Sequence, residues 1–339
     1  MLSIFSQRLL TVLQLSRMAL VFTAIADSLC AVMIWAQWRA LDGRPLAEYL
    51  NLPHTSAVAI MSLGLYGFGM SLNDINDRRR DSQMASHRPI PSGRIGIVAA
   101  HIVCAMFGLA ALIAGIYVTM FTEAGALSFI LLIWTALLIT FYDFAGKYLV
   151  APGLLTLGLI RFFHATIAAP RMPLLWHPLL LMNHVAILST IAYRWEAKRP
   201  PLTRVHWWAV LGGLGCVDLL CIGLVGFRRY PKFGFDLADA LWISPGLLFP
   251  AAAVMVFAIL TIVIRRVAGD TRRAGQMLML YGLMWLIVYD ASFVAGYVSI
   301  LYGALLLLLL PLTFLAVQFM RWWSKVLSLS QKPQFQRAR

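Results

Sequence analysis

Charged residues are scarce in this chain of 339 residues. They make up 12% of the sequence, about half of their share in a typical soluble domain, whereas 61% of the residues are hydrophobic. The mean hydropathy is +0.79. Acidic residues are the scarcest, with 14 Asp and Glu against 28 Lys and Arg. This composition excludes a water-soluble domain of this size, because so few charges could not cover its surface.

The chain has only four cysteines, Cys30, Cys104, Cys216 and Cys221, and each lies inside an apolar stretch. This placement argues against a disulfide framework or a zinc cluster. A cleavable secretion signal is not expected in residues 1–17, because the segment is short and lacks a small-residue cleavage pattern. Its spaced apolar residues predict an N-terminal interfacial segment instead.

The apolar residues form long blocks, each close to the ~20 residues that a helix needs to cross a bilayer. The sequence therefore predicts an all-α fold, a polytopic membrane bundle of nine or ten transmembrane helices in one domain over residues 18–320. The last apolar run, 276–320, is too long for one crossing, and we expect a tight turn between Gly296 and Gly303. The predicted spans are 18–38, 55–73, 95–119, 124–142, 150–169, 174–193, 207–226, 242–264, 276–297 and 299–320.

Every second loop between these spans is rich in basic residues. The loops after the second, fourth, sixth and eighth spans are basic, which is typical of cytoplasmic loops. A basic cytoplasmic tail is predicted over 321–339, and an inside N-terminus then requires an even number of crossings. The loops account for the formal net charge of +14, so nucleic-acid binding is not expected. We expect a multi-pass protein of a bacterial cell inner membrane with its site facing the cytoplasm.

The most informative stretch follows the second span and reads Asn73-Asp74-Ile75-Asn76-Asp77-Arg78-Arg79-Arg80-Asp81, with Arg88-Pro89-Ile90-Pro91-Ser92-Gly93 after it. If the helix continues, Asn73, Asp77 and Asp81 follow at i, i+4 and i+8 and share one face. Two carboxylates and an amide on one face suit Mg²⁺ that also binds substrate phosphate. A bare run of charge would more often be a solvated helix end. The ordered segment that follows favours a functional site.

Two other predicted spans end in charge on the same side. The fourth ends with Tyr142-Asp143 followed by Lys147, and the sixth ends with Arg194-Trp195-Glu196. If these ends lie beside the acidic stretch, they form one pocket with metal ligands and basic groups, which is a diphosphate site. Apolar walls behind the pocket would hold a hydrocarbon tail and protect a carbocation from water. The pattern indicates a lipid-soluble substrate that carries a diphosphate.

The sequence resembles the UbiA superfamily of intramembrane prenyltransferases. Asn73-Asp74-x-x-Asp77-x-x-x-Asp81 matches its first aspartate-rich motif, Arg88-Pro89-x-Pro91-Ser92-Gly93 matches the segment after it, and Lys147 stands where the family has a basic residue. One departure is the family's second motif, Asp-x-x-x-Asp, because the chain reads Thr190-Ile191-Ala192-Tyr193-Arg194-Trp195-Glu196 there. This segment resembles the EboC-like branch, as do Thr23-Ala24-Ile25-Ala26-Asp27 and Arg161-Phe162-Phe163-His164.

The resemblance implies Mg²⁺-dependent transfer of a prenyl group from a polyprenyl diphosphate donor to a small or aromatic acceptor, within the membrane lipid. It implies that Asn73, Asp77 and Asp81 hold the metal, with Asp74 as a further ligand or an orienting residue. Asp143 would either bind metal or only pair with the lysine four residues later.

The resemblance also assigns the groups around the leaving pyrophosphate. Arg88, Lys147 and Arg194 are the expected phosphate-binding residues, and the altered second motif replaces one metal ligand set by Arg194. Glu196 would hold a second metal through water or take the acceptor's proton. The expected catalytic residues are Asp77, Asp81 and Glu196.

Three ionisable residues, Asp27, Arg161 and His164, lie within apolar spans. A buried charge needs a partner, so we expect them to pair with one another. Arg161 is a candidate for binding the acceptor, and a structural role is the alternative. Asp290 also lies within a span and is assigned no role.

Two other functions stay open. The altered second motif would also suit a non-catalytic UbiA-like protein that binds or helps export a lipid-linked or secondary-metabolite precursor. Turnover of a prenyl diphosphate separates this alternative from an enzyme. A secondary transporter would show inverted repeats with broken helices in matching positions of its two halves, and the sequence shows no such pairing.

Overall fold

All regular structure is helical in the residues that the computed structural model describes, which are 2–40, 46, 50–121, 125–172, 174–234 and 236–330. Three short 3₁₀ turns precede longer helices: η1 (Met18–Leu20), η2 (Gly146–Tyr148) and η3 (Pro245–Leu247). The α-helices are α1 (Leu2–Leu15), α2 (Val21–Ala40), α4 (Leu52–Met84), α5 (Ile97–Phe121), α6 (Gly125–Phe144), α7 (Val150–Ile167), α8 (Trp176–Trp195), α9 (Arg204–Phe233), α10 (Leu237–Ala240), α11 (Leu248–Val267), α12 (Thr271–Tyr297), α13 (Ile300–Leu307) and α14 (Leu309–Ser330).

Nine helical segments of the described chain are long and apolar enough to cross a membrane, with α13 and α14 together forming one of them. The sixth predicted span is α8, which is also 20 residues long but less apolar. Its polar side chains are accommodated inside the protein, because His177, Asn183 and His184 each form a hydrogen bond with a neighbouring helix. The predicted all-α bundle is confirmed. With α8, the described residues contain ten long helical segments.

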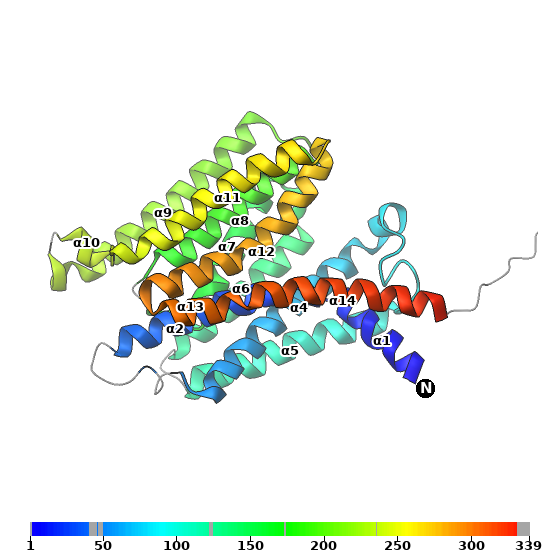
Figure 1. Ribbon diagram of the computed structural model, residues 1–339, viewed down its shortest axis with the longest axis horizontal. Coiled ribbons are helices and arrows are strands. Elements are labelled where there is room, and N and C mark those ends of the chain that lie inside the picture. Colours follow the sequence, from blue (N-terminus) through cyan, green and yellow to red (C-terminus); the bar gives the residue numbers. More distant parts are fainter. Residues whose placement is uncertain are drawn as a thin grey trace, which may run out of the picture.

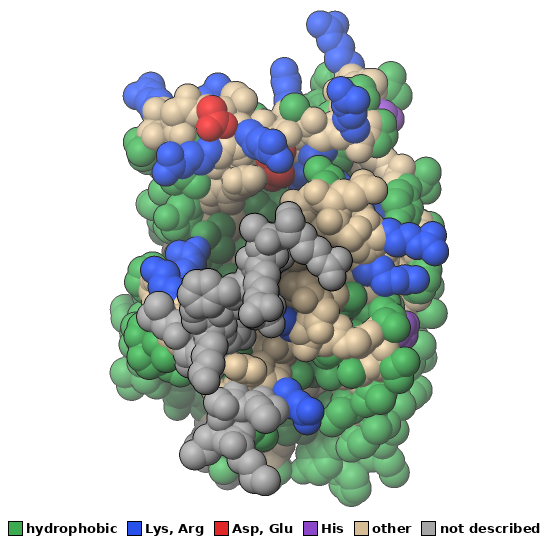
Figure 2. All heavy atoms as spheres, turned by 90° about the vertical axis from the view of Figure 1, so that its right-hand side faces the viewer, with side chains coloured by type: hydrophobic (Ala, Val, Ile, Leu, Met, Phe, Trp, Pro, Cys, Tyr) green, Lys and Arg blue, Asp and Glu red, His purple; other side chains and the backbone are tan. Residues whose placement is uncertain are grey.

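The loops that are rich in Lys and Arg gather at one end of the bundle (Figure 1). The basic loops, which follow α4, α6, α8 and α11, lie at the same end as α1 and the last turns of α14. The two terminal helices touch there, since Trp323 Nε1 donates a hydrogen bond to Ser6 Oγ at 2.8 Å. Figure 2 looks onto this end and shows Lys and Arg spread over it, with few acidic side chains. We call it the basic end. Terminal helices at one end are consistent with an even number of crossings.

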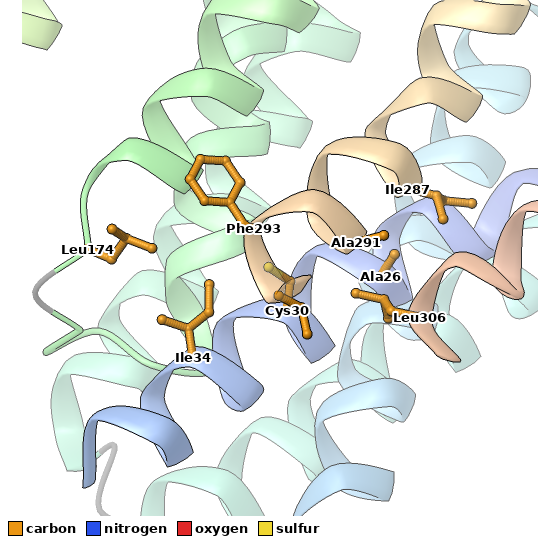
Figure 3. Packing of buried hydrophobic residues seen from close by; sticks show 9 residues of the cluster. Ala26, Cys30, Ile34, Leu174, Ile287, Ala291, Phe293 and Leu306 are labelled. Carbon is orange, nitrogen blue, oxygen red and sulfur yellow. The ribbon is translucent and has the colours of Figure 1, made fainter. Parts of the chain in front are cut away.

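The helices divide into inner and outer ones. In α2, α4, α7 and α12, 50–61% of the most apolar stretch of the helix is buried inside the protein. In α5, α6, α9, α11 and the α13–α14 segment, the buried share of this stretch is only 11–22%. The outer helices therefore turn most of their apolar surface toward lipid. Figure 3 shows the inner contact of α2 with α12, where Ala26, Cys30 and Ile34 pack with Ile287 and Ala291. This contact fixes α2 next to the other inner helices.

The predicted break in the last apolar run is confirmed. α12 ends at Tyr297, and Ser299 caps the start of α13 with its side chain. The break thus falls between Gly296 and Gly303. Part of the predicted tail continues α14 as far as Ser330, and the rest of the tail lies outside the described residues.

Candidate active site

α4 carries the acidic stretch on one continuous helix. It has 33 residues and ends at Met84, well beyond the end predicted for the second span. A helix of this length is about 50 Å long and projects past a hydrocarbon core of about 30 Å. Asn73, Asp77 and Asp81 therefore share one face at the basic end, as predicted, over about 12 Å.

Basic side chains from other segments hold the acids on this face. Lys147 Nζ donates to Asp77 Oδ1 at 2.6 Å, and Arg88 Nη1 donates to Asp81 Oδ2 at 2.6 Å. The segment after α4 is folded into a turn, in which Ser92 Oγ donates to the carbonyl oxygen of Arg88 at 2.6 Å. The turn directs Arg88 back at the helix, so the two parts of the sequence motif form one structural unit.

Arg17 belongs to this site although it was not among the predicted residues. Its Nη2 donates to Asp74 Oδ1 at 3.1 Å, and its carbonyl oxygen accepts a hydrogen bond from Tyr66 Oη at 3.3 Å. Arg17 has a φ of 48°, in the left-handed region that few residues other than glycine adopt. This conformation turns the chain between α1 and α2. The sequence offered only one signal, a basic residue before an apolar span, which membrane topology alone explains.

A tight turn after α6 positions Lys147. Lys147 lies in η2, and this turn packs so closely on the start of α7 that a Cβ at Gly153 would collide with the carbonyl oxygen of Gly146. Asp143 Oδ1 lies 4.0 Å from Lys147 Nζ. The same oxygen is buried and has no hydrogen-bond partner. The geometry is thus compatible with both roles considered for Asp143, metal binding and ion pairing.

A cavity of about 360 Å³ lies between α2, α4, α6, α7, α8 and α12. Small-molecule sites have volumes of roughly 300–1,000 Å³. Asn73 and Asp143 line the cavity at the basic end, and Arg161 and His164 line its inner part. The wall between these polar groups is mainly apolar and includes Leu20, Ala24, Leu65, Met70, Ile139, Leu157, Ile160, Val185, Met279 and Leu283.

The three buried ionisable residues that were expected to pair do so at the inner part of the cavity. Arg161 Nε lies 3.0 Å from Asp27 Oδ2, and His164 Nδ1 lies 3.4 Å from the same oxygen. Arg161 Nη2 also donates to Thr23 Oγ1 at 2.8 Å. Asp27 is fully buried. Arg161 therefore compensates a negative charge that would strongly destabilise the bundle if it were left unpaired.

Asp290, to which no role was assigned from the sequence, forms a second buried pair outside the cavity lining. Its Oδ1 is 2.7 Å from His177 Nε2, and both side chains are fully buried. Cys30, shown between α2 and α12 in Figure 3, donates to the Asp290 carbonyl oxygen at 3.5 Å. This cluster joins α2, α8 and α12 at the core of the bundle.

The end of α8 contributes less to the cavity than its charged residues suggested. Val185 and Ser189 line the cavity. Arg194 follows Val185 by nine residues, about half a turn around the helix axis, and it is exposed. Glu196 follows Ser189 by seven residues on the same side, beyond the lining, and pairs with Lys198 at 3.3 Å. Glu196 therefore lies at the rim, whereas Arg194 faces away from the cavity.

The charges at this end of the cavity form two groups of ion pairs. In one group Arg17 and Arg88 pair with Asp74 and Asp81, and in the other Lys147 pairs with Asp77 and Asp143, so that four carboxylates face three basic side chains. One carboxylate is in excess, and hard oxygen ligands of this kind suit a divalent cation. The basic groups beside them suit phosphate oxygens. The arrangement can therefore hold a cation and an anionic phosphate group together.

Comparisons with known proteins indicate which family and which fold this chain resembles. Residues 31–182 match the UbiA prenyltransferase family. A digeranylgeranylglyceryl phosphate synthase structure is similar over 86% of this chain and 99% of its own, with a TM-score of 0.55 and 15% identity. A UbiA homolog from Archaeoglobus fulgidus bound to Cd²⁺ covers 94% of this chain and 99% of its own, with a TM-score of 0.43 and 13% identity. No curated protein matches the chain.

The similarity to the digeranylgeranylglyceryl phosphate synthase structure, at a TM-score of 0.55, is evidence for the fold alone. The matched residues 31–182 contain the acidic face of α4, the Arg88 turn, Lys147 and the inner pair of Arg161 and His164. The rim residue Glu196 lies outside the matched part. Residues 31–182 therefore resemble the UbiA prenyltransferase family, in agreement with the enzyme class that the sequence predicted.

Proposed function

We propose that the mouth of the cavity binds the diphosphate of a polyprenyl donor with Mg²⁺, and that the cavity holds the prenyl chain next to a small or aromatic acceptor. One observation carries the proposal: the acidic face of α4, which meets Lys147 and Arg88 at 2.6 Å each, begins at Asn73, and Asn73 lines an apolar cavity. A prenyl diphosphate has the same order of parts, with a charged head on an apolar chain.

The oxygen donors at the mouth fit Mg²⁺. Asn73, Asp77 and Asp81 share one face of α4, and Asp143 adds a buried oxygen without a hydrogen-bond partner. Asp74 is held by Arg17 and is better placed to orient the cluster than to bind the ion. When bound, the metal neutralises and orients the phosphates.

The basic residues bind the donor's phosphates and stabilise the leaving pyrophosphate. Lys147 and Arg88 already lie within hydrogen-bond distance of the acids, so they are close enough to reach phosphate oxygens placed there. Their charge offsets the negative charge that grows on the pyrophosphate as the C–O bond breaks. Arg17 approaches from a third side and serves the same purpose. Glu196, at the rim, is the remaining candidate for a second metal through water.

We place the protein in the EboC-like branch and in a bacterial inner membrane, with the basic end in the cytoplasm. The branch rests on the altered segment of α8, where Glu196 is the one carboxylate and Arg194 replaces an acid. The orientation rests on the basic loops, which gather at one end of the bundle (Figure 2). The family match ends before this segment of α8.

The proposal is tested by prenyl transfer in lipid nanodiscs. Wild-type protein receives Mg²⁺, prenyl diphosphates of increasing chain length and a cell extract as the source of acceptor, and prenylated products are found by mass spectrometry. Asp77→Asn should lower product formation roughly a hundredfold or more, the scale on which charge-stabilising groups act. Asp239→Asn is the matched control, because Asp239 lies on α10 at the opposite end (Figure 1).

A donor that binds but is recovered unchanged from every mixture would contradict transfer. That result would favour the non-catalytic alternative, in which the protein binds or helps export a lipid-linked precursor. The preferred chain length among reacting donors would identify the natural donor class.

A further inference from the structure

A second group of metal-binding side chains lies inside the bundle, apart from the mouth of the cavity. Among the described residues, Cys30 of α2, His177 of α8 and Asp290 of α12 bring a sulfur, a nitrogen and an oxygen atom within 4.8 Å of one another. All three side chains are fully buried, and none of them lines the cavity. Figure 3 shows Cys30 at the contact of α2 with α12. The proposed prenyl transfer leaves this group without a task.

The group holds more polar atoms than its hydrogen bonds use. His177 Nε2 is 2.7 Å from Asp290 Oδ1, and Cys30 Sγ donates to the Asp290 carbonyl oxygen at 3.5 Å. His177 Nδ1 and Asp290 Oδ2 are buried as well, but the described residues offer them no hydrogen-bond partner. Polar atoms are rarely left unpaired in a protein interior. A bound ion would account for lone pairs that the protein leaves unused.

A further carboxylate stands beside this group. Asp27 lies three residues before Cys30, on the same side of α2, and its carboxylate is close to that of Asp290. Arg161 compensates the charge of Asp27. The charge of Asp290 must then be neutralised either by a proton or by a cation, because two buried carboxylates repel each other.

The ligand types favour zinc over magnesium. Zn²⁺ binds Cys, His and carboxylate ligands in a tetrahedral site, in which the ligand atoms are about 3.3–3.8 Å apart. The three side chains would need to adjust by about 1 Å to reach this geometry. Mg²⁺ requires oxygen ligands and keeps several waters. The neighbours of Cys30 in Figure 3, such as Ala26, Ile34 and Phe293, are apolar and bring no side-chain oxygen.

Zinc binding would leave the net charge of the group unchanged. The ion would replace two protons, one from the Cys30 thiol and one that neutralises the pair of His177 and Asp290. The thiolate and the carboxylate then carry two negative charges against the two positive charges of Zn²⁺. A neutral group is compatible with the apolar interior, where an uncompensated charge would be strongly destabilising.

We propose that Cys30, His177 and Asp290 bind one Zn²⁺, and that this ion ties α2, α8 and α12 together. The fourth position of the ion is open to Asp27 or to a water molecule. The site contains a single thiolate, unlike the multi-cysteine clusters that the sequence argued against. It takes no part in prenyl transfer, so its test does not depend on the proposed function.

The first test uses protein made in cells supplied with Co²⁺, because an ion can reach this buried site only while the chain folds. The purified protein is washed with EDTA, which removes ions from the mouth, where Arg17 and Arg88 are partly exposed. Wild type should retain about one Co²⁺ per chain and show the near-ultraviolet charge-transfer band of a thiolate ligand. The oxygen ligands of the mouth cannot give this band.

Cys30→Ser should lose this band and retain at least about tenfold less Co²⁺. Serine keeps the size and the hydrogen-bond donor of cysteine, so the packing of α2 on α12 is preserved. Cys104→Ser is the matched control, because Cys104 is also buried and donates to a backbone carbonyl, that of Phe68 at 3.6 Å, but lies on α5. This variant should keep the band. Wild type that retains no Co²⁺, or a band unchanged in Cys30→Ser, would overturn the proposal.

The second test separates a bound ion from a hydrogen-bonded junction. After the same EDTA wash, wild type from cells grown with zinc should have a higher Tm than wild type from zinc-depleted cells. The Tm of His177→Gln and Asp290→Asn should not respond to the zinc supply. Should these variants fail to fold, Cys30→Ser decides, because it keeps the hydrogen bonds and loses only the soft ligand. A wild-type Tm that is independent of zinc would contradict the site.

Discussion

Replacing Lys147 with methionine should strengthen the binding of a divalent cation when no donor is present. Lys147 Nζ lies 2.6 Å from Asp77 Oδ1, and the two side chains are only 9% and 16% exposed. A cation must displace this lysine before it reaches the carboxylate. Methionine keeps most of the length and the apolar stem of lysine but removes the charge and the hydrogen bond.

The size of the effect follows from the contact that is lost. A hydrogen bond to a charged group contributes about 1.5–3 kcal/mol, and each 1.4 kcal/mol changes an equilibrium constant tenfold. Cation binding in Lys147→Met should therefore tighten roughly ten- to a hundredfold. Affinity for a prenyl diphosphate should fall by a similar factor, because the same substitution removes a phosphate-binding charge.

The assay is titration with Mn²⁺, followed by electron paramagnetic resonance, on protein purified in detergent without donor. Asp77→Asn should weaken Mn²⁺ binding, which identifies the carboxylate as a ligand. Lys232→Met is the matched control, because Lys232 lies in the last turn of α9, at the opposite end of the bundle from the acidic face of α4 (Figure 1). Mn²⁺ binding that is unchanged or weaker in Lys147→Met would refute the competition between lysine and metal.

Two further predictions concern how the site is held. Gly153→Ala should displace the turn that carries Lys147 and lower turnover by about a hundredfold, the typical effect of a shift near 1 Å. The control Gly212→Ala should leave turnover unchanged, because a Cβ there meets open space. Equal turnover in the two variants would contradict the role of the turn. Arg161→Met leaves the buried Asp27 unpaired and should cost about 3–5 kcal/mol of stability, seen as a lower Tm in detergent. Adding Asp27→Asn should recover most of this loss, and a double variant less stable than Arg161→Met would refute the pairing.

The features that follow local rules were predictable from the sequence. The common face of Asn73, Asp77 and Asp81 depends only on the helical repeat, once α4 continues past the apolar part of the span. The pairing of Asp27 with Arg161 follows from the cost of leaving either charge alone in an apolar bundle. The turn between Gly296 and Gly303 follows from the length of an apolar run.

The features that depend on packing between distant segments were not predictable in the same way. Arg17 reaches α4 because of one left-handed backbone conformation, which no local pattern announces. Arg194 was expected in the pocket from its place in a motif, but its angle around α8 relative to Val185 turns it away. That angle becomes meaningful only when the cavity-facing side of α8 is known.

The same limit applies to His164 in the inner part of the cavity. The sequence predicted that His164 would pair with Asp27 and Arg161, because all three lie within apolar spans. Only the packed bundle shows that His164 lines the cavity and that its ring nitrogens have no hydrogen-bond partner.

In the proposed function, the acidic face of α4, the Arg88 turn and Lys147 together bind a prenyl diphosphate and release its pyrophosphate. The most direct measurement is pyrophosphate release from geranyl diphosphate and longer donors by wild type and Asp77→Asn in nanodiscs, with and without Mg²⁺, in the presence of acceptor extract. We predict release that requires Mg²⁺ in the wild type and is lost in Asp77→Asn. Release at equal rates in both proteins, or none from any donor that demonstrably binds, would contradict the claim.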